Sequence, residues 1–524
     1  MELRLQRLAA LMAACAAAVA LTACGGGGGG GGGAFLPQGA TLQPPTEPLA
    51  EDDAIVASAS VAALCAAPRT GIDPDTGATF PDRSGTIADE KRWVRGWIDE
   101  TYLWFSEVPT RLASKDYANP VAWFDVLKTP QLTASGRAKD RFHFTMATAA
   151  YRALSQGGIE VSYGFELAFL SASPPRDVRV AYTEPNSPAA QAGIVRGTRV
   201  IEVDGVDVAG GSDTATLNAA LVPAREGEAH SFRLRGPDGS ERTLSLAAAR
   251  VTRLPVQNVK TIATASGPVG YMQLNDHLAT AEAALIAAVN QLQGAGIVDL
   301  VVDMRYNGGG LLDVASELAS MVSSAGATTG AVFERLVFNS KNPFRVAPAQ
   351  AALPFHTTSR GFSTPVGQAL PRLGLSRVTV LAGPDTCSAS ESVINSLRGV
   401  GVAVDLIGGT TCGKPYGFLP QDNCGTTYFA IQFQGVNNQG FGDYGDGFAP
   451  TCAVADDFDH ALGDPAEARL AAALSFRSSG ACPAPASSKA ELARRKAEAQ
   501  GAPYLIRSQV RENRILATLR ATQP

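Results

Sequence analysis

The sequence predicts a multidomain α/β protein, because three stretches with different residue patterns follow one another along its 524 residues. The first has aromatic and aliphatic residues at helical spacing, the second has short alternating strands, and the third repeats strand and helix. A chain of this length can bury several cores. We therefore expect a leader at 1–24, a tether at 25–68, an N-terminal helical region at 69–157, a β-rich domain at 158–255, a layered α/β domain at 256–475 and a helical tail at 476–524.

The first 24 residues have the pattern of an export signal. Arg4 and Arg7 precede an apolar run at 8–21 that is too short to span a bilayer comfortably. The run ends in LTAC at 21–24, which resembles the lipobox of bacterial lipoproteins. That resemblance implies cleavage before Cys24, a lipid on Cys24 and a cell-envelope protein that faces the periplasm. An ordinary cleaved signal is the alternative.

Nine glycines at 25–33 and a Pro-, Thr- and Ala-rich stretch to Pro68 come next. Polyglycine has no side chains to bury, so we interpret this part as a tether. It does not match a phosphate-binding glycine loop, because no strand precedes it and no helix follows it. The net charge of −5, with both signs mixed along the chain, argues against a nucleic-acid partner.

Six cysteines remain when the leader cysteine and Cys24 are set aside. In an exported chain an even number favours disulfides, but six cysteines allow fifteen connectivities, and the sequence assigns none. Zinc is disfavoured because no close C-x-x-C pair occurs. The six are Cys65, Cys387, Cys412, Cys424, Cys452 and Cys482.

In the N-terminal region, Trp93, Trp97 and Ile98 recur at helical spacing within a run that continues to Phe105. This predicts one apolar helix face packed on a core rather than a ligand platform. A second helix is expected at 121–127.

The β-rich domain contains alternating runs at 178–182 and 200–203. Between them, Ser187 and Pro188 are typical of a helix start, and Gly193 of its end. Asp204 and Gly205 then predict a tight turn.

This order of strand, capped short helix, strand and turn resembles a PDZ domain. The resemblance implies binding of an extended peptide along an open sheet edge. By position, the loop that would receive the peptide carboxylate is Tyr163, Gly164, Phe165 and Glu166. The alternative is that this domain only packs against its neighbour.

The α/β domain shows two cycles of strand, helix and strand, which implies parallel layering. The first cycle includes the glycine turn Asn307-Gly308-Gly309-Gly310. The expected strands are 269–274, 297–304, 377–382 and 402–407, and the expected helices are 282–292, 312–322 and 388–397.

Ser388 stands where one of these strands ends and a helix begins. A hydroxyl there lies beside the outward amides of a helix N-terminus, which can stabilise negative charge on a carbonyl oxygen. The other interpretation is a capping box, because Glu391 follows three residues later. The segment alone does not decide between them.

Lys414 follows the next strand in a segment of small residues, GGTTCGKP at 408–415. A lysine near a buried cleft can lose its proton, since burial disfavours the charged form. A neutral amine can then take the proton of a serine hydroxyl. A solvated surface lysine is the alternative.

Taken in order, DMRYNGGG, TCSASE and GGTTCGKP behind a PDZ-like domain resemble the C-terminal processing (tail-specific) serine peptidases. The resemblance implies a layered, crotonase-like ββα-spiral catalytic domain, with Ser388 as nucleophile and Lys414 as base. It implies an oxyanion hole at Ala389 and at Gly309 or Gly310. Two further positions, Glu391 and Thr411, match functionally sensitive ones, and no metal or organic cofactor is implied.

The sequence departs from the family pattern in two respects. The spacing of 26 positions from Ser388 to Lys414 is one residue longer than the usual pattern, which a loop before Val402 can absorb. Many relatives have a glutamine four residues after the lysine, where this chain has Phe418; Gln421 is the remaining candidate. None of the five histidines stands in a motif that matches a Ser-His-Asp triad. We predict an endopeptidase acting on protein or peptide substrates. The alternatives are a catalytically silent PDZ-containing scaffold of the cell envelope that binds peptides, and an acyl-transfer enzyme acting on small molecules.

Overall fold

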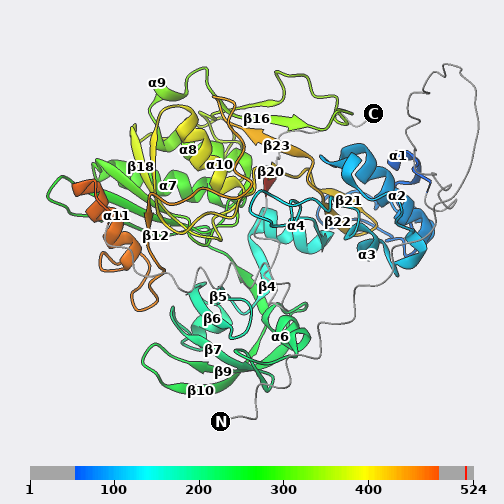
Figure 1. Cartoon of the computed structure of the whole chain (residues 1–524), viewed down its shortest axis with the longest axis horizontal. Helices are drawn as coiled ribbons and strands as arrows, with labels where there is room; N and C mark the ends of the chain where they lie inside the picture. Colours follow the sequence, from blue (N-terminus) through cyan, green and yellow to red (C-terminus); the bar gives the residue numbers. More distant parts are fainter. Residues whose placement is uncertain (1–53, 483–513, 516–524) are drawn as a thin grey trace, which may run out of the picture. The chain divides into compact units, whose positions relative to one another are not determined.

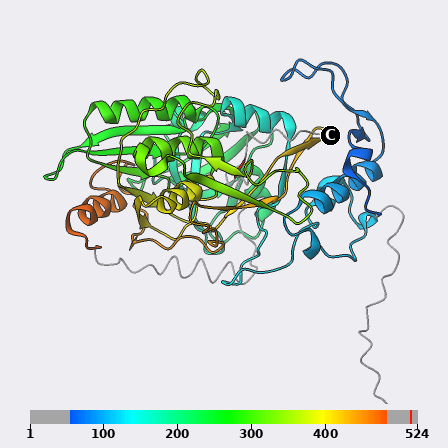
Figure 2. The same cartoon turned by 90° about the horizontal axis from the view of Figure 1, so that it is seen from above.

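The computed structural model describes residues 54–482 and the pair 514–515 (Figures 1 and 2). The predicted leader, the predicted lipidation site Cys24 and residues 25–53 of the predicted tether lie outside this part, as does most of the predicted tail. Those predictions stay untested. Within the described part, no helix is both long and apolar enough to cross a bilayer.

Folded structure begins before residue 69, inside the stretch interpreted as a tether. Val61 is buried and Cys65 is fully buried, joined by a disulfide to Cys424. The composition gives no sign of this, because residues 54–68 are mostly small. The elements here are α1 (Ser58–Val61), β1 (Leu64–Cys65) and β2 (Arg83–Ser84).

Helix α2 (Ile87–Thr101) carries the predicted apolar face, and a capping box of Thr86 and Asp89 starts it. Trp93 and Trp97 stack with ring centroids 5.5 Å apart in the core. The helix stops before Phe105 because the backbone N–H of Leu103 donates to the carbonyl of Ile431 at 2.7 Å. The chain continues through 3₁₀ turns and short elements: α3 (Pro120–Phe124), β3 (Phe144–Ala147) and α4 (Thr148–Gly157).

The β-rich domain is an antiparallel sheet in the order β10-β9-β7-β6-β5, with β8 paired to β7. Ser187 Oγ accepts the N–H of Ala190 and starts α5, as the sequence predicts. The strands are β5 (Phe165–Ser171), β6 (Asp177–Thr183), β7 (Arg199–Val203), β8 (Val206–Asp207), β9 (Ala229–Arg235) and β10 (Glu241–Ala247). The helices are α5 (Pro188–Gln191) and α6 (Thr214–Leu221), and β4 (Ile159–Ser162) pairs with β11 (Ala249–Thr252).

The α/β domain contains a six-stranded sheet in the order β12-β13-β14-β18-β19-β24. All neighbours from β13 onward run parallel, which confirms the predicted layering, while β12 is antiparallel to β13. The strands are β12 (Val256–Ile262), β13 (Val269–Leu274), β14 (Asp299–Asp303), β18 (Arg377–Ala382), β19 (Ala403–Gly408) and β24 (Cys452–Ala453).

Helices cover both faces of this sheet (Figure 1). Successive strand residues point to opposite faces, so Met272 packs in the large core with α7, α8 and α10, whereas Tyr271 packs with α11. The helices are α7 (Ala281–Gly294), α8 (Leu312–Val322), α9 (Ala325–Thr328), α10 (Ala389–Gly399) and α11 (Ala468–Ser479).

Two small sheets complete the domain. One has the order β17-β16-β23-β20, and the other has the order β21-β22-β3. In the second sheet, β3 from the N-terminal region pairs with β22, so the two regions fold around a shared core. The strands are β16 (Val332–Phe338), β17 (Ala352–Pro354), β20 (Tyr416–Gly417), β21 (Gln421–Asn423), β22 (Thr426–Phe429) and β23 (Phe433–Val436).

Candidate active site

Ser388 lies in the turn between β18 and α10 with φ +60° and ψ −114°. A side chain rarely adopts this backbone conformation, and it persists only where the surroundings hold it. The N–H of the preceding residue, Cys387, donates to the carbonyl of Asn307 at 3.0 Å, and Thr386 Oγ1 donates to the carbonyl of Met304 at 2.8 Å. The turn is therefore fixed to the segment that carries the glycine turn.

The side chain of Ser388 is fully buried, and its Oγ has no hydrogen-bond partner in the described part of the chain. The backbone N–H of Ser388 donates to Glu391 Oε2 at 3.0 Å, so the glutamate performs its half of the predicted capping box. A buried hydroxyl without a partner costs free energy and calls for a functional explanation. No histidine is bonded to it.

Lys414 is also fully buried. Its Nζ lies 4.0 Å from the ring centroid of Phe418 and 4.8 Å from that of Phe142. The two aromatic rings therefore flank the head group of Lys414. Phe418 thus contacts the amine at the position where a glutamine was expected, while Gln421 lies in β21 and donates to the carbonyl of Asp422 at 3.4 Å.

The carboxylate of Glu391 joins the serine turn to the lysine loop. Besides the Ser388 amide, it accepts the Thr411 hydroxyl at 2.6 Å, the Gly413 N–H at 2.8 Å and the Lys414 N–H at 2.8 Å. Burial raises the pKa of the Glu391 carboxyl, and these hydrogen bonds act in the opposite direction. The two functionally sensitive positions predicted from the sequence are therefore bonded to each other.

A disulfide joins the same two segments. Cys387 precedes Ser388 and is bonded to Cys412, two residues before Lys414. Their sulfurs and a carboxylate oxygen of Glu391 lie within 4.8 Å of one another, but each sulfur is bonded to the other, so neither is a free thiolate there. The sequence left fifteen pairings open; the other two observed bonds are Cys65–Cys424 and Cys452–Cys482.

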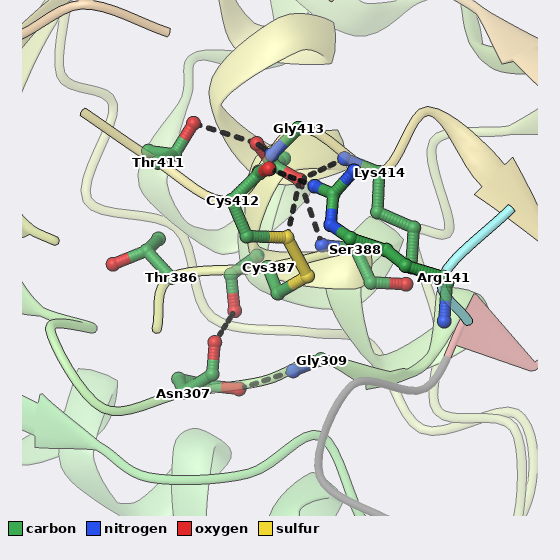
Figure 3. Close-up of a disulfide and its surroundings, with 12 residues drawn as sticks. Arg141, Asn307, Gly309, Thr386, Cys387, Ser388, Thr411, Cys412, Gly413 and Lys414 are labelled. Atoms are coloured by element: carbon green, nitrogen blue, oxygen red, sulfur yellow. Dashed lines mark hydrogen bonds between the residues drawn. A yellow bond between two sulfur atoms is a disulfide. The ribbon is translucent and has the colours of Figure 1, made fainter. Parts of the chain in front are cut away.

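The glycine turn lies beside Ser388 (Figure 3). Gly309 and Gly310 have φ of +114° and +136°, and a Cβ on Gly310 would lie 2.5 Å from the carbonyl oxygen of His277. The Gly309 N–H donates to Asn307 Oδ1 at 2.9 Å. Ala389 begins α10, where backbone N–H groups have no partner within the helix. Its amide is thus better placed than that of Gly309 to receive an oxyanion in this state.

His277 was not predicted as a residue of the site, because it belongs to no sequence motif. It is fully buried between β13 and α7, its Nδ1 lies 3.3 Å from Asn307 Oδ1, and its backbone pairs with Gly309 and Leu311. Burial lowers the pKa of His277 to about 4, so the ring is neutral and braces the glycine turn.

Two arginines of the N-terminal region were also missed. Arg137 donates to the carbonyl of Cys412 at 3.1 Å, and Arg141 donates to the same oxygen. They hold the loop before Lys414. Contacts between residues some 270 positions apart leave no local signal in the sequence from which they could be predicted.

The predicted peptide-binding loop consists of Tyr163 and Gly164, between β4 and β5, and the first two residues of β5, the edge strand of the β-rich sheet. Gly164 has φ +81°, and a Cβ there would lie 2.1 Å from that of Ser187. Tyr163 is buried and donates to the carbonyl of Ala220 at 3.1 Å, and Phe165 packs against it. Glu166 lies 3.9 Å from Arg253.

Comparison with known proteins gives the class of the site. Residues 268–421 match the model of peptidase family S41, and residues 89–144 match the model of the peptidase S41 N-terminal domain. These matches include the glycine turn, Ser388 and Lys414. Together with the relatives below, they make this part of the chain similar to peptidases of family S41.

The relatives are processing peptidases. The chain is 29% identical over 258 residues to a carboxyl-terminal-processing protease of Picosynechococcus sp., and 28% identical over 251 residues to a chloroplastic C-terminal processing peptidase of Tetradesmus obliquus. These matches cover 47% and 44% of this chain. They cover 53% and 52% of the relatives, so the chain spans about half the length of the curated relatives that it matches.

A solved S41 protease from Bacteroides fragilis has the same fold. The TM-score is 0.57 at 22% identity, covering 77% of this chain and 100% of that chain. The mixed α/β prediction agrees with this likeness.

Proposed function

We propose that this chain is a serine endopeptidase that cleaves protein or peptide substrates with Ser388 as nucleophile and Lys414 as general base. The observation that carries the proposal is the Ser388 hydroxyl, buried and unbonded at a strained helix start. Lys414 is held from the same carboxylate, that of Glu391.

In the proposed reaction, the neutral amine of Lys414 takes the proton of Ser388 Oγ as this oxygen attacks the carbonyl carbon of the substrate. The negative charge moves to the carbonyl oxygen, which Ala389 N–H and Gly309 or Gly310 N–H stabilise. The C–N bond breaks, and the leaving amine receives the proton from Lys414. A water molecule then attacks the ester carbon as the same amine takes its proton. The bond to Ser388 Oγ breaks, and Lys414 returns the proton to this oxygen.

We assign Glu391 and Thr411 positioning roles and leave Gln421 without one. Glu391 holds the backbones of both reacting residues, and Thr411 orients Glu391. The fold proposed for this domain is the crotonase-like ββα spiral.

For the β-rich domain we propose a PDZ-like role in recognising or gating substrate tails. The edge strand β5 is paired only with β6 among the described strands, which leaves one side for an added peptide strand. The loop at Tyr163, Gly164, Phe165 and Glu166 would receive the tail carboxylate. Gating is supported by Arg196 of this domain, which donates at 2.8 Å to the hydroxyl of Tyr306, next to the glycine turn.

We also propose that the protein is a periplasm-facing lipoprotein anchored through Cys24. In bacterial cells, Cys24→Ala should release the protein from the membrane fraction. Continued membrane association of the variant would contradict the anchor.

The test of the dyad uses Ser388→Ala and Lys414→Ala, with Ser478→Ala and Lys341→Ala as controls at exposed positions away from the reacting groups. The first two should lose cleavage of an unstructured polypeptide and keep the urea unfolding midpoint, and the controls should cleave normally. A fluorophosphonate probe should label wild type and neither dyad variant. Near-normal turnover by Lys414→Ala would overturn the base assignment, and a wild type that neither cleaves nor labels would favour a silent peptide-binding scaffold.

A further inference from the structure

A two-residue strand from the far C-terminal part of the chain, β25 (Arg514–Ile515), pairs in parallel with β15 (Gly310–Leu311). In the register, Gly310 is opposite Arg514 and Leu311 is opposite Ile515. These two strands form a sheet of their own, so β15 has β25 as its strand partner in the described part of the chain.

The strand β15 lies next to the proposed catalytic residues. The strand begins directly after Gly309 of the glycine turn and leads into α8. β25 also contacts β20, which starts two residues after Lys414. Figure 3 shows the red ribbon of β25 at the margin of the site that holds Ser388 and Lys414. One short stretch of the chain's own backbone thus contacts the strand that follows Gly309 and the strand that follows Lys414.

Backbone pairing of this kind is how an extended peptide adds to an open strand edge. The main-chain groups supply the hydrogen bonds, so many sequences can bind. Moreover, Ser388 and Lys414 have no exposed surface, although a peptidase must bring a substrate chain to the serine. The structure therefore holds the site in a closed state, with a peptide segment already paired beside it.

We propose that the edge of β15 is the acceptor for an extended peptide next to Ser388, and that residues 514–515 of the same chain occupy it in competition with substrate. The inference rests on the proposed peptidase function and adds the binding mode and an internal competitor.

Competition from within one chain can be strong even when the pairing is weak. A covalently connected segment acts at an effective concentration on the order of 1 mM. If the free segment bound with a dissociation constant of about 0.1 mM, the KM for substrate would be raised about tenfold, and kcat would stay unchanged.

The experiment compares full-length wild type with Arg514→Pro/Ile515→Pro. Adjacent strand residues direct their N–H groups to opposite sides, so two prolines remove whichever N–H faces β15. The matched control, Arg520→Pro/Ala521→Pro, removes the same charge outside the pair. The double variant at 514–515 should show a KM for an unstructured polypeptide about tenfold lower at equal kcat, and a synthetic peptide of residues 505–524 should restore the higher KM. The control should behave as wild type.

A second measurement does not depend on cleavage. On a Ser388→Ala background, hydrogen exchange of the peptide covering 308–312 should be slower with the native tail than with prolines at 514 and 515. Equal exchange, or equal KM, would overturn the proposal while leaving the peptidase assignment intact. Shortening of the tail in wild type but not in Ser388→Ala would also overturn it, because the segment would then be consumed as a substrate. Failure of the proposed function itself would appear as wild type and proline variant both lacking fluorophosphonate labelling.

Discussion

Glu391 Oε2 accepts the backbone N–H of Lys414 at 2.8 Å, and the same oxygen accepts the N–H of Ser388 at 3.0 Å. One carboxylate oxygen therefore sets the distance between the backbones of the proposed nucleophile and base. The side chain that looks like a helix cap in the sequence also holds together two segments of the site.

Glu391→Ala should cost more than about 3 kcal/mol in the free energy of unfolding, because it leaves three buried N–H groups and the Thr411 hydroxyl without an acceptor. Glu391→Gln keeps one acceptor oxygen and should cost less. Urea unfolding and the rate of fluorophosphonate labelling measure both effects. Unchanged labelling by Glu391→Ala would contradict the positioning role.

The two short-range disulfides form a matched pair, with sequence separations of 25 and 30 residues. The chain-entropy model gives each about 3.5 kcal/mol of stability. Cys387→Ser/Cys412→Ser and Cys452→Ser/Cys482→Ser should thus lower the unfolding free energy similarly. Only the first should slow labelling of Ser388, because only Cys387–Cys412 joins the serine turn to the lysine loop. Equal slowing in both would show that global stability, not this bond, sets the rate.

Gly310→Ala should disrupt the glycine turn. The new Cβ would lie 2.5 Å from the carbonyl oxygen of His277 at a backbone φ of +136°. Gly296→Ala is the control, since Gly296 also has positive φ but has open space where the Cβ would go. We expect the control to lower the free energy of unfolding by about 1 kcal/mol, and Gly310→Ala to lower it by at least about 2 kcal/mol more. Gly310→Ala should also lose cleavage. Thermal and urea unfolding would measure the difference, and equal costs would contradict the steric argument.

His277 should make stability depend on pH. Its pKa is lowered from 6.5 to about 4 by burial, so the unfolded chain binds the extra proton first as pH falls. The stabilisation is complete above pH 6.5 and declines as pH falls towards 4, by up to about 3 kcal/mol.

Buried Glu184 acts in the opposite sense, because desolvation raises its pKa to about 7. The pH dependence of the unfolding free energy of the wild type therefore contains contributions from both His277 and Glu184. His277→Gln isolates the histidine, and its unfolding free energy relative to wild type should improve by about that amount between pH 7 and pH 4. A difference that does not change with pH would refute the assignment.

The sequence predicted most accurately the helices and strands whose ends are set by neighbouring residues. The bounds of β18 and α8 match the predicted ranges, since each is a buried run with clear ends. The helix through Trp93 and Trp97 was placed too long, because its end depends on a hydrogen bond to Ile431, more than 300 residues away. The folded part of 54–68 was missed for a similar reason, because it is held by a disulfide to the distant Cys424.

The site follows the same division. Ser388, Lys414 and Glu391 were found because their segments carry motifs, and the structure brings all three together. His277 and Arg137 act through tertiary contacts, which no local signal encodes. The suggestion that Gln421 orients the lysine gains no support, since Phe418 lies against the amine instead.

The disulfide between Cys65 and Cys424 can form only late in synthesis, because the two cysteines are 359 residues apart. A ribosome adds about 5–20 residues per second, so the Cys65 thiol waits roughly 20–70 s for its partner. Any bond that it forms earlier joins the wrong sulfur and must be exchanged. The N-terminal segment is therefore cross-linked to the rest of the chain only after β18, the serine turn and the lysine loop have all been synthesised.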